Sequence, residues 1–394
     1  MRNGMHTASI SLSLVLFALF SIPRDISAGR KEKEVPKKGK GEQTAKIKQE
    51  MGLSLNDVSK SLVTITTSSG AAGTGFIVKD PKDQKIYLYT NQHVVRECDN
   101  FKAATSDNRE IKLGTFLVSA SRDIVRFLLP EEDPKNALDL AENVTAEEPI
   151  AVFGNSGGGG VFTSIYGRVV GVGPDRLEVS AKFIPGNSGS PVLNKDKKVV
   201  GIATYATQRR AKADWTVKGT RFSQVRRFAF KVDASVKWVP MQWASYQKMA
   251  SHIADDKKSM KDVFDVAVKW VQAPYDKMTK DCSEMDLKMW VKNHNKFAAK
   301  LDRAIAKGYA SDAKMKAINK VSKAQTIKNY KSLSSICSRR AMGIKRNVQK
   351  YGKTLTPYLK EAMLSNAKQF ESMAKEIEAY GKNISNKDAV VRKQ

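Results

Sequence analysis

Residues 186–192 read Gly186-Asn187-Ser188-Gly189-Ser190-Pro191-Val192, and they dominate the interpretation of this chain. A serine in a turn of small residues suits nucleophilic attack on a carbonyl, because the carbonyl can reach both the hydroxyl and adjacent backbone N–H groups. Residues 154–157 repeat the first four letters around Ser156. Three more glycines follow that four-letter pattern, whereas a proline and a strand-like run follow the pattern around Ser188. Ser188 is therefore the candidate nucleophile.

A serine nucleophile needs a base, and histidine is scarce in this chain. Of the four histidines, His93 is the only one between His6 near the N-terminus and His252. It stands in the run Thr-Asn-Gln-His-Val-Val, just after a strand-like segment. Asp123 precedes another apolar run and suits the buried carboxylate that orients such a base. The order His93, Asp123, Ser188 predicts a catalytic triad.

The pattern of apolar and polar residues changes near Pro240. A chain of 394 residues exceeds what one core usually holds, so two folded units are expected. Residues 56–240 carry short β-branched and aromatic runs separated by glycines and polar turns, which is typical of an all-β sandwich or barrel. Residues 241–394 carry apolar side chains three and four apart, which predicts an all-α unit of four to six helices.

The N-terminus has the pattern of a secretory signal. Residues 1–28 hold an early arginine, an apolar stretch and the small-residue site Ile-Ser-Ala. The apolar stretch is shorter than a comfortable membrane span, although an uncleaved anchor stays open. Residues 29–55 are rich in Lys, Glu and Gly and predict a basic disordered or loosely helical linker. The mature chain is therefore expected to be secreted or periplasmic, without a transmembrane helix.

The charge is strongly positive and is concentrated in the C-terminal half. The net charge is +28, and residues 245–394 hold 32 Lys+Arg against 15 Asp+Glu. Such an excess favours polyanionic partners, for example an anionic surface or polymer. No specific nucleic acid is predicted. A solvated lysine-rich surface that binds nothing in particular is the alternative.

The sequence contains three cysteines and does not decide whether any two of them form a disulfide. In an oxidising compartment Cys282 and Cys337 could form a disulfide, which would leave Cys98 unpaired. Three buried thiols are the alternative, because spacing alone does not show whether the α-carbons approach each other.

Residues 61–239 resemble the trypsin-like serine peptidases, closest to the bacterial HtrA-type and glutamyl-endopeptidase-type branches. No PDZ-like strand pattern follows, so the chaperone and oligomer roles of the HtrA branch are not carried over. The residues that carry the resemblance are Gly73 to Val78 before the base, Thr90 to Val95 around it, Asp123 to Val125, Ala151 to Asn155, and Gly186 to Val192.

The resemblance implies a double six-stranded β-barrel with the site in the cleft between the barrels. His93 and Asp123 would come from the first barrel and Ser188 from the second. The backbone N–H groups of Gly186 and Ser188 would form the oxyanion hole, and the hydroxyl of Thr204 would lie beside the aspartate. No metal or organic cofactor is implied.

The resemblance also locates the first substrate pocket. Where relatives have small residues, this chain has Lys182 and Arg227. Two cations beside a buried pocket predict a preference for an acidic residue before the cut. If both side chains face solvent instead, Phe183 and its apolar neighbours predict a small or medium apolar residue. The pocket residues are Lys182, Phe183, Ile184 and Pro185 on one side, and Tyr205, Ala206 and Arg227 on the other.

Two functions from different classes follow. The first is an exported serine endopeptidase that cleaves polypeptides through an acyl-enzyme and docks by its basic helical domain. The second is a catalytically silent trypsin-like scaffold that binds acidic polymers or proteins.

Overall fold

The computed structural model describes residues 40–68, 70–96, 98, 100–208, 225–279, 282–308 and 312–386. The expected signal peptide, residues 1–28, lies outside these ranges, as do residues 209–224. The described chain divides into two compact units. One contains the residues up to Ser251 together with Thr356–Tyr358, and the other contains His252–Leu355 and the chain from Leu359 onward.

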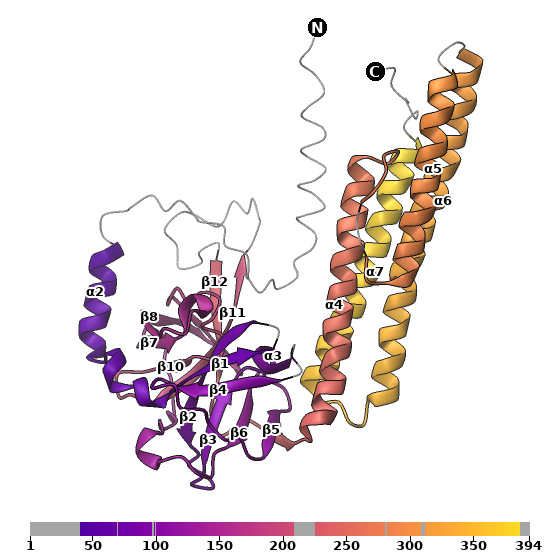
Figure 1. The fold of residues 1–394 in the computed structure, drawn as a ribbon. Helices are drawn as coiled ribbons and strands as arrows, with labels where there is room; N and C mark the ends of the chain where they lie inside the picture. Colours follow the sequence, from indigo (N-terminus) through magenta and orange to yellow (C-terminus); the bar gives the residue numbers. More distant parts are fainter. Residues whose placement is uncertain are drawn as a thin grey trace. The chain divides into compact units, whose positions relative to one another are not determined.

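The first half of the β region forms a seven-stranded antiparallel sheet (Figure 1). A six-stranded barrel was expected here, and the extra strand is β13 (Trp238–Pro240), which returns from beyond the second barrel to pair with β5. Trp238 anchors that return, because its ring packs edge-on against Tyr89 at 5.5 Å between centroids. The other strands are β1 (Leu62–Thr67), β2 (Ala72–Lys79), β3 (Ile86–Thr90), β4 (Phe101–Thr105), β5 (Phe116–Ser119) and β6 (Val125–Leu128).

The second half of the β region closes into the expected six-stranded barrel, in the order β10-β11-β12-β9-β8-β7. Every neighbouring pair for which a register is defined is antiparallel. Closure leaves no unpaired strand edge in the barrel. The strands are β7 (Pro149–Gly154), β8 (Thr163–Val172), β9 (Arg176–Val179), β10 (Pro191–Leu193), β11 (Val199–Gln208) and β12 (Val225–Lys231).

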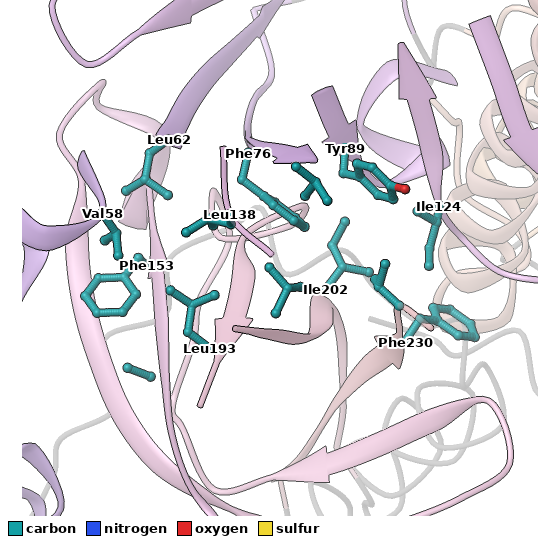
Figure 2. Packing of buried hydrophobic residues seen from close by; sticks show 14 of the residues in the cluster. Val58, Leu62, Phe76, Tyr89, Ile124, Leu138, Phe153, Leu193, Ile202 and Phe230 are labelled. Carbon is teal, nitrogen blue, oxygen red and sulfur yellow. The ribbon is translucent and has the colours of Figure 1, made fainter. Parts of the chain in front are cut away.

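One hydrophobic cluster joins the two β structures. It contains Phe76 and Tyr89 from the first sheet and Phe153, Leu193 and Phe230 from the barrel, all of them buried. Figure 2 shows these side chains among the packed residues of the cluster. Since the cluster is shared, the residues at the ends of strands from both halves are held at a fixed separation.

Within residues 29–55, for which a disordered or loosely helical linker was predicted, residues 40–51 are helical. They form helix α2 (Lys40–Met51), followed by two short 3-10 turns, η1 (Leu55–Asp57) and η2 (Ser59–Ser61). Ile47 and Met51 lie four apart, so they share one face of the helix, and both are buried in the shared cluster. The Tyr166 hydroxyl donates to the Leu53 carbonyl at 2.8 Å just beyond the helix. Two apolar residues among many charges are a weak sequence signal, although their packing decides the structure.

The C-terminal region is helical, as predicted. Its described residues form α4 (Trp243–Gln272), α5 (Met285–Gly308), α6 (Asp312–Tyr351) and α7 (Pro357–Asn386) (Figure 1). The first nine residues of α4 group with the β unit, and the compact helical unit begins at His252. No helix in the described ranges is long and apolar enough to cross a membrane.

The helical unit buries its apolar stripes and its cysteines. Trp270 and Phe370 are fully buried representatives of two stripes with helical spacing. Cys282 and Cys337 are both buried as thiols and are not joined in a disulfide. Burial raises the pKa of the Cys337 thiol to about 12, so it stays protonated and unreactive at neutral pH.

A buried carboxyl makes the stability of the helical unit depend on pH. Burial raises the pKa of Asp256 to about 7, against the opposing charge of Arg340 and with the help of Asp255. The folded state therefore holds a proton that the unfolded state has lost, and stability falls as pH rises from about 4 through 7. Asp256→Asn removes this penalty, and we expect it to stabilise the helical unit by about 2 kcal/mol at pH 8.5 and hardly at all at pH 4.

Chemical denaturation followed by circular dichroism at both pH values measures this difference. Asp255→Asn is the matched control, because Asp255 is the exposed neighbour on the same helix. Equal stabilisation by the two variants, or the same gain at both pH values, contradicts the prediction.

Candidate active site

The base and its carboxylate come from the first sheet. Helix α3 (Gln92–Arg96) follows β3 directly and carries His93. Asp123 precedes β6 and accepts two hydrogen bonds from that histidine: the backbone N–H at 3.0 Å and the ring Nδ1–H at 2.5 Å. The Nδ1–H bond fixes the tautomer, so Nε2 is the ring nitrogen that can accept a proton. This is the orientation that a general base requires.

The charge of Asp123 is stabilised although the residue is buried. Burial alone raises the pKa of this carboxyl, but the charge of His93, its hydrogen bonds and the nearby Arg96 outweigh that effect and lower the pKa below its usual range. The carboxylate therefore remains ionised at neutral pH. An ionised partner is what stabilises an imidazolium once the base has taken a proton.

A side-chain amide connects this pair to the barrel. Asn91 Nδ2 donates to the Asp123 carbonyl at 2.7 Å and to Thr204 Oγ1 at 3.1 Å. The Thr204 hydroxyl itself donates to the Ile202 carbonyl at 3.0 Å. Thr204 thus lies in the network around the aspartate, and its hydroxyl hydrogen is directed at β11 backbone.

The candidate nucleophile lies in a turn that only glycines can form. Gly186 and Gly189 have φ of +93° and +86°, which β-carbon-bearing residues rarely adopt. A Cβ on Gly189 would lie 2.0 Å from the Thr74 carbonyl oxygen, and one on Gly186 would lie 2.1 Å from the Asn155 carbonyl oxygen. Glycine is therefore required at positions 186 and 189 for two reasons: the backbone has positive φ, and the segments around Thr74 and Asn155 approach too closely for a β-carbon.

The turn presents unpaired backbone donors. Within the described ranges, the N–H groups of Gly186 and Ser188 have no protein acceptor. Their neighbours do: Asn187 N–H donates to the Ile184 carbonyl at 3.0 Å, and Gly189 N–H donates to the Ala203 carbonyl at 2.9 Å. Two free donors around a serine are the composition of an oxyanion hole, which binds the negative oxygen of a tetrahedral intermediate.

The structure brings the nucleophile turn and the base to the same strand, β2. A Cβ on Gly73 would lie 2.6 Å from a methyl group of Val94, the residue after the base, and 3.3 Å from the Ser188 carbonyl oxygen. The Ser188 hydroxyl donates to the Thr204 carbonyl at a long 3.5 Å. Nucleophile contacts are often loose in a structure without substrate and tighten in the reacting complex.

Thr74 lies in the run Gly73 to Val78 that carries the resemblance, but no role in the site was assigned to it from the sequence. It is fully buried, its N–H donates to the Ser188 carbonyl at 2.9 Å, and its hydroxyl donates to the Gly186 carbonyl at 2.9 Å. The same hydroxyl accepts the Asn155 N–H at 2.9 Å. Thr74 thereby ties the first sheet to both glycine-rich loops. Its position between Gly73 and Gly75 was the available signal, but a threonine in a strand is too common to single out.

The second serine in a Gly-Asn-Ser-Gly pattern supports the first. The Ser156 hydroxyl hydrogen-bonds to the Thr163 hydroxyl and to the side chain of Asn187, whose Nδ2 donates to Ser156 at 3.1 Å. Asn187 Oδ1 in turn accepts the Ile184 N–H at 3.0 Å. Ser156 therefore helps to hold the turn that carries Ser188.

The predicted pocket residues do not all face the same way. Lys182 is exposed, and Arg227 donates from Nε to the Phe183 carbonyl at 3.0 Å. Phe183 packs into a hydrophobic cluster of the barrel, while Ile184 is 48% exposed. The Tyr205 ring stacks on Phe228 at 5.2 Å between centroids. Pro185 is exposed and Ala206 is half-buried.

Comparison with known families gives a match for the part of the chain that holds the candidate triad. Residues 73–202 match the family model of the trypsin-like peptidase domain. The chain therefore contains a trypsin-like peptidase domain. The match spans His93, Asp123 and the turn around Ser188.

Two curated relatives share part of this region. A probable periplasmic serine endoprotease, DegP-like, of Rickettsia conorii is 28% identical over 153 residues, which cover 35% of this chain and 29% of the relative. The protein with the same description from Rhizobium meliloti is 32% identical over 143 residues, covering 34% of this chain and 28% of the relative. The chain thus spans less than a third of the length of these relatives. Among solved structures, the Rv3671c protease from M. tuberculosis in its active form is 20% identical, covers 45% of this chain and 78% of its own, and has a TM-score of 0.35.

Proposed function

We propose that the protein is a serine endopeptidase in which Ser188, His93 and Asp123 act as the catalytic triad. The observation that carries the proposal is the doubly hydrogen-bonded His93–Asp123 pair, placed with the Ser188 turn against β2. In the proposed reaction the Ser188 hydroxyl attacks a peptide carbonyl and His93 Nε2 takes its proton. His93 then returns that proton to the leaving amine, and water hydrolyses the acyl-enzyme through the same two steps.

The remaining groups have defined parts in this scheme. The developing oxyanion would accept hydrogen bonds from the Gly186 and Ser188 N–H groups, which have no protein acceptor within the described residues. Asp123 would hold the ring and stabilise the imidazolium. Thr74 would keep the turn in shape through its two bonds to residues 186 and 188.

Export and docking are separate proposals. The relatives described as periplasmic support export to the periplasm, together with the signal-like sequence of residues 1–28. Docking by the helical unit rests on its positive charge alone. Both are independent of the triad chemistry.

Covalent labelling tests the proposed activity. A fluorophosphonate probe, which reacts with activated serines, is expected to modify the folded full chain at Ser188, as mapped by mass spectrometry of its peptides. His93→Ala should abolish the adduct, because the serine then lacks its base. A folded sample that is not labelled would favour the silent-scaffold function instead.

A further inference from the structure

The first turns of α4 belong to the peptidase unit. Residues 243–251 group with the β structures, although the rest of α4 lies in the helical unit. Aromatic rings hold them there: Tyr246 packs against Phe116 at 5.0 Å and against Trp243 at 5.7 Å between ring centroids. Trp243 in turn packs on Phe101 at 5.5 Å. Tyr246 is therefore fixed by contacts that involve strands β4 and β5 of the first sheet.

The hydroxyl of Tyr246 binds the backbone directly beside the candidate base. Tyr246 is fully buried, and its hydroxyl donates to the Gln92 carbonyl at 3.2 Å. The Gln92 carbonyl and the His93 N–H belong to one peptide group. That N–H donates to Asp123 Oδ1 at 3.0 Å. One peptide group is thus bound at both ends, by the phenol and by the carboxylate.

The geometry of a peptide group makes these two bonds dependent on each other. The peptide bond between Gln92 and His93 is trans, so its C=O and N–H point in opposite directions within one plane. Fixing the direction of the carbonyl therefore fixes the direction of the N–H. A hydrogen bond to the carbonyl also polarises the peptide group, which strengthens the bond that its N–H donates. The Tyr246 hydroxyl acts on the carboxylate through this peptide group.

The loop that carries Asp123 is held by other contacts. The Ala120 N–H donates to the Lys237 carbonyl at 2.9 Å, and the Tyr358 N–H donates to the Ala120 carbonyl at 2.9 Å. These bonds fix the position of the loop backbone. The Tyr246 hydroxyl instead orients the peptide group that the carboxylate binds.

We propose that Tyr246 is a positioning residue of the triad, whose hydroxyl orients the peptide group that joins His93 to the Asp123 carboxylate. This inference rests on the proposed function. The His93 N–H holds Oδ1 while Oδ2 binds the imidazole ring, so a peptide group that is free to rotate leaves the carboxylate poorly aimed. The working peptidase unit then includes the first turns of α4, which lie beyond the family match at residues 73–202.

Tyr246→Phe tests the proposal because it removes the hydroxyl and keeps the ring that packs on Phe116. We expect kcat on a peptide substrate to fall about tenfold, because the carboxylate then orients His93 less well. We expect KM to stay unchanged, because the hydroxyl is bound to the backbone and does not contact substrate in the proposed reaction. Steady-state kinetics measures both quantities.

Amide hydrogen exchange measures the peptide group itself. The measurement is made in a Ser188→Ala background, which prevents self-cleavage. There we expect Tyr246→Phe to speed the exchange of the His93 N–H about tenfold relative to the amides of β2 and β3. This readout does not depend on peptide cleavage, so it separates failure of this inference from failure of the proposed activity.

Tyr166→Phe is the matched control. The Tyr166 hydroxyl also donates to a backbone carbonyl, that of Leu53 at 2.8 Å, but it comes from β8 in the barrel. This variant should change neither kcat nor the exchange of the His93 N–H. Unchanged His93 exchange in Tyr246→Phe overturns the proposal, and so does an unchanged kcat. A uniform rise in exchange across the first sheet also overturns it, because it indicates only a general loss of stability.

Discussion

Replacing Ser188 with alanine is expected to lower kcat for peptide hydrolysis by about six orders of magnitude, because no other group can form the acyl-enzyme. The fold should survive, since the Ser188 hydroxyl makes only a long 3.5 Å bond to the Thr204 carbonyl. The contacts that hold the turn use the Ser188 backbone carbonyl and its neighbours, which alanine retains. Steady-state kinetics on a chromogenic peptide, with circular dichroism of the same sample, measures both quantities.

Ser156→Ala is the matched control for this experiment. Ser156 stands in the same four-letter pattern but bonds to Thr163 and Asn187, so its loss should loosen the turn without removing the nucleophile. We expect at most a tenfold decrease in kcat, which corresponds to about 1.4 kcal/mol for one lost hydrogen-bonding group. If Ser156→Ala inactivates the protein and Ser188→Ala does not, the assignment of the nucleophile is wrong.

Asp123→Asn is expected to lower kcat by about four orders of magnitude, because the base is left in the wrong tautomer. The amide that replaces the carboxylate can donate to Nδ1, which moves the ring hydrogen to Nε2. The Nε2 atom then cannot accept the proton of Ser188. Geometry should otherwise be preserved, since asparagine and aspartate have nearly the same shape. Kinetics at neutral pH measures the loss.

Asp80→Asn distinguishes this chemical effect from the loss of any buried carboxylate. Asp80 is buried in the same sheet and pairs with the Arg126 guanidinium. Breaking such a pair lowers the free energy of unfolding by about 3 kcal/mol or more, but kcat of the folded protein should hardly change. A comparable loss of kcat in both variants would show that Asp123 acts through stability and not through the tautomer of His93.

The residues of the candidate site could be singled out from the sequence because each motif is local. Gly186 and Gly189 are required by the backbone of the turn itself, with positive φ and no room for a β-carbon. His93 and Asp123 follow and precede strands in motifs that resemble a known family. Short-range geometry of this kind leaves a pattern within a few residues, so the amino-acid sequence carries it directly.

Other parts of the fold correspond to weaker patterns in the sequence than the motifs of the candidate site do. The helix α2 holds only two large apolar residues, Ile47 and Met51, among many charges, and its stability comes from the core it packs against. The seventh strand of the first sheet, β13, is three residues long and pairs with a strand more than 100 residues earlier. The segment Thr356–Tyr358 looks like an ordinary helix start.

The amino-acid sequence alone was enough to propose a serine nucleophile with one available base and acid, and to predict a β region followed by helices. It was not enough to identify the groups that support this triad. Thr74 meets Gly186, and the Tyr358 N–H meets the Ala120 carbonyl, only after distant segments have packed together. The physical reason is the distance along the sequence between the residues that interact. A turn or an amphipathic stripe is specified by neighbouring residues, whereas a hydrogen bond between remote segments depends on how the whole core brings them together.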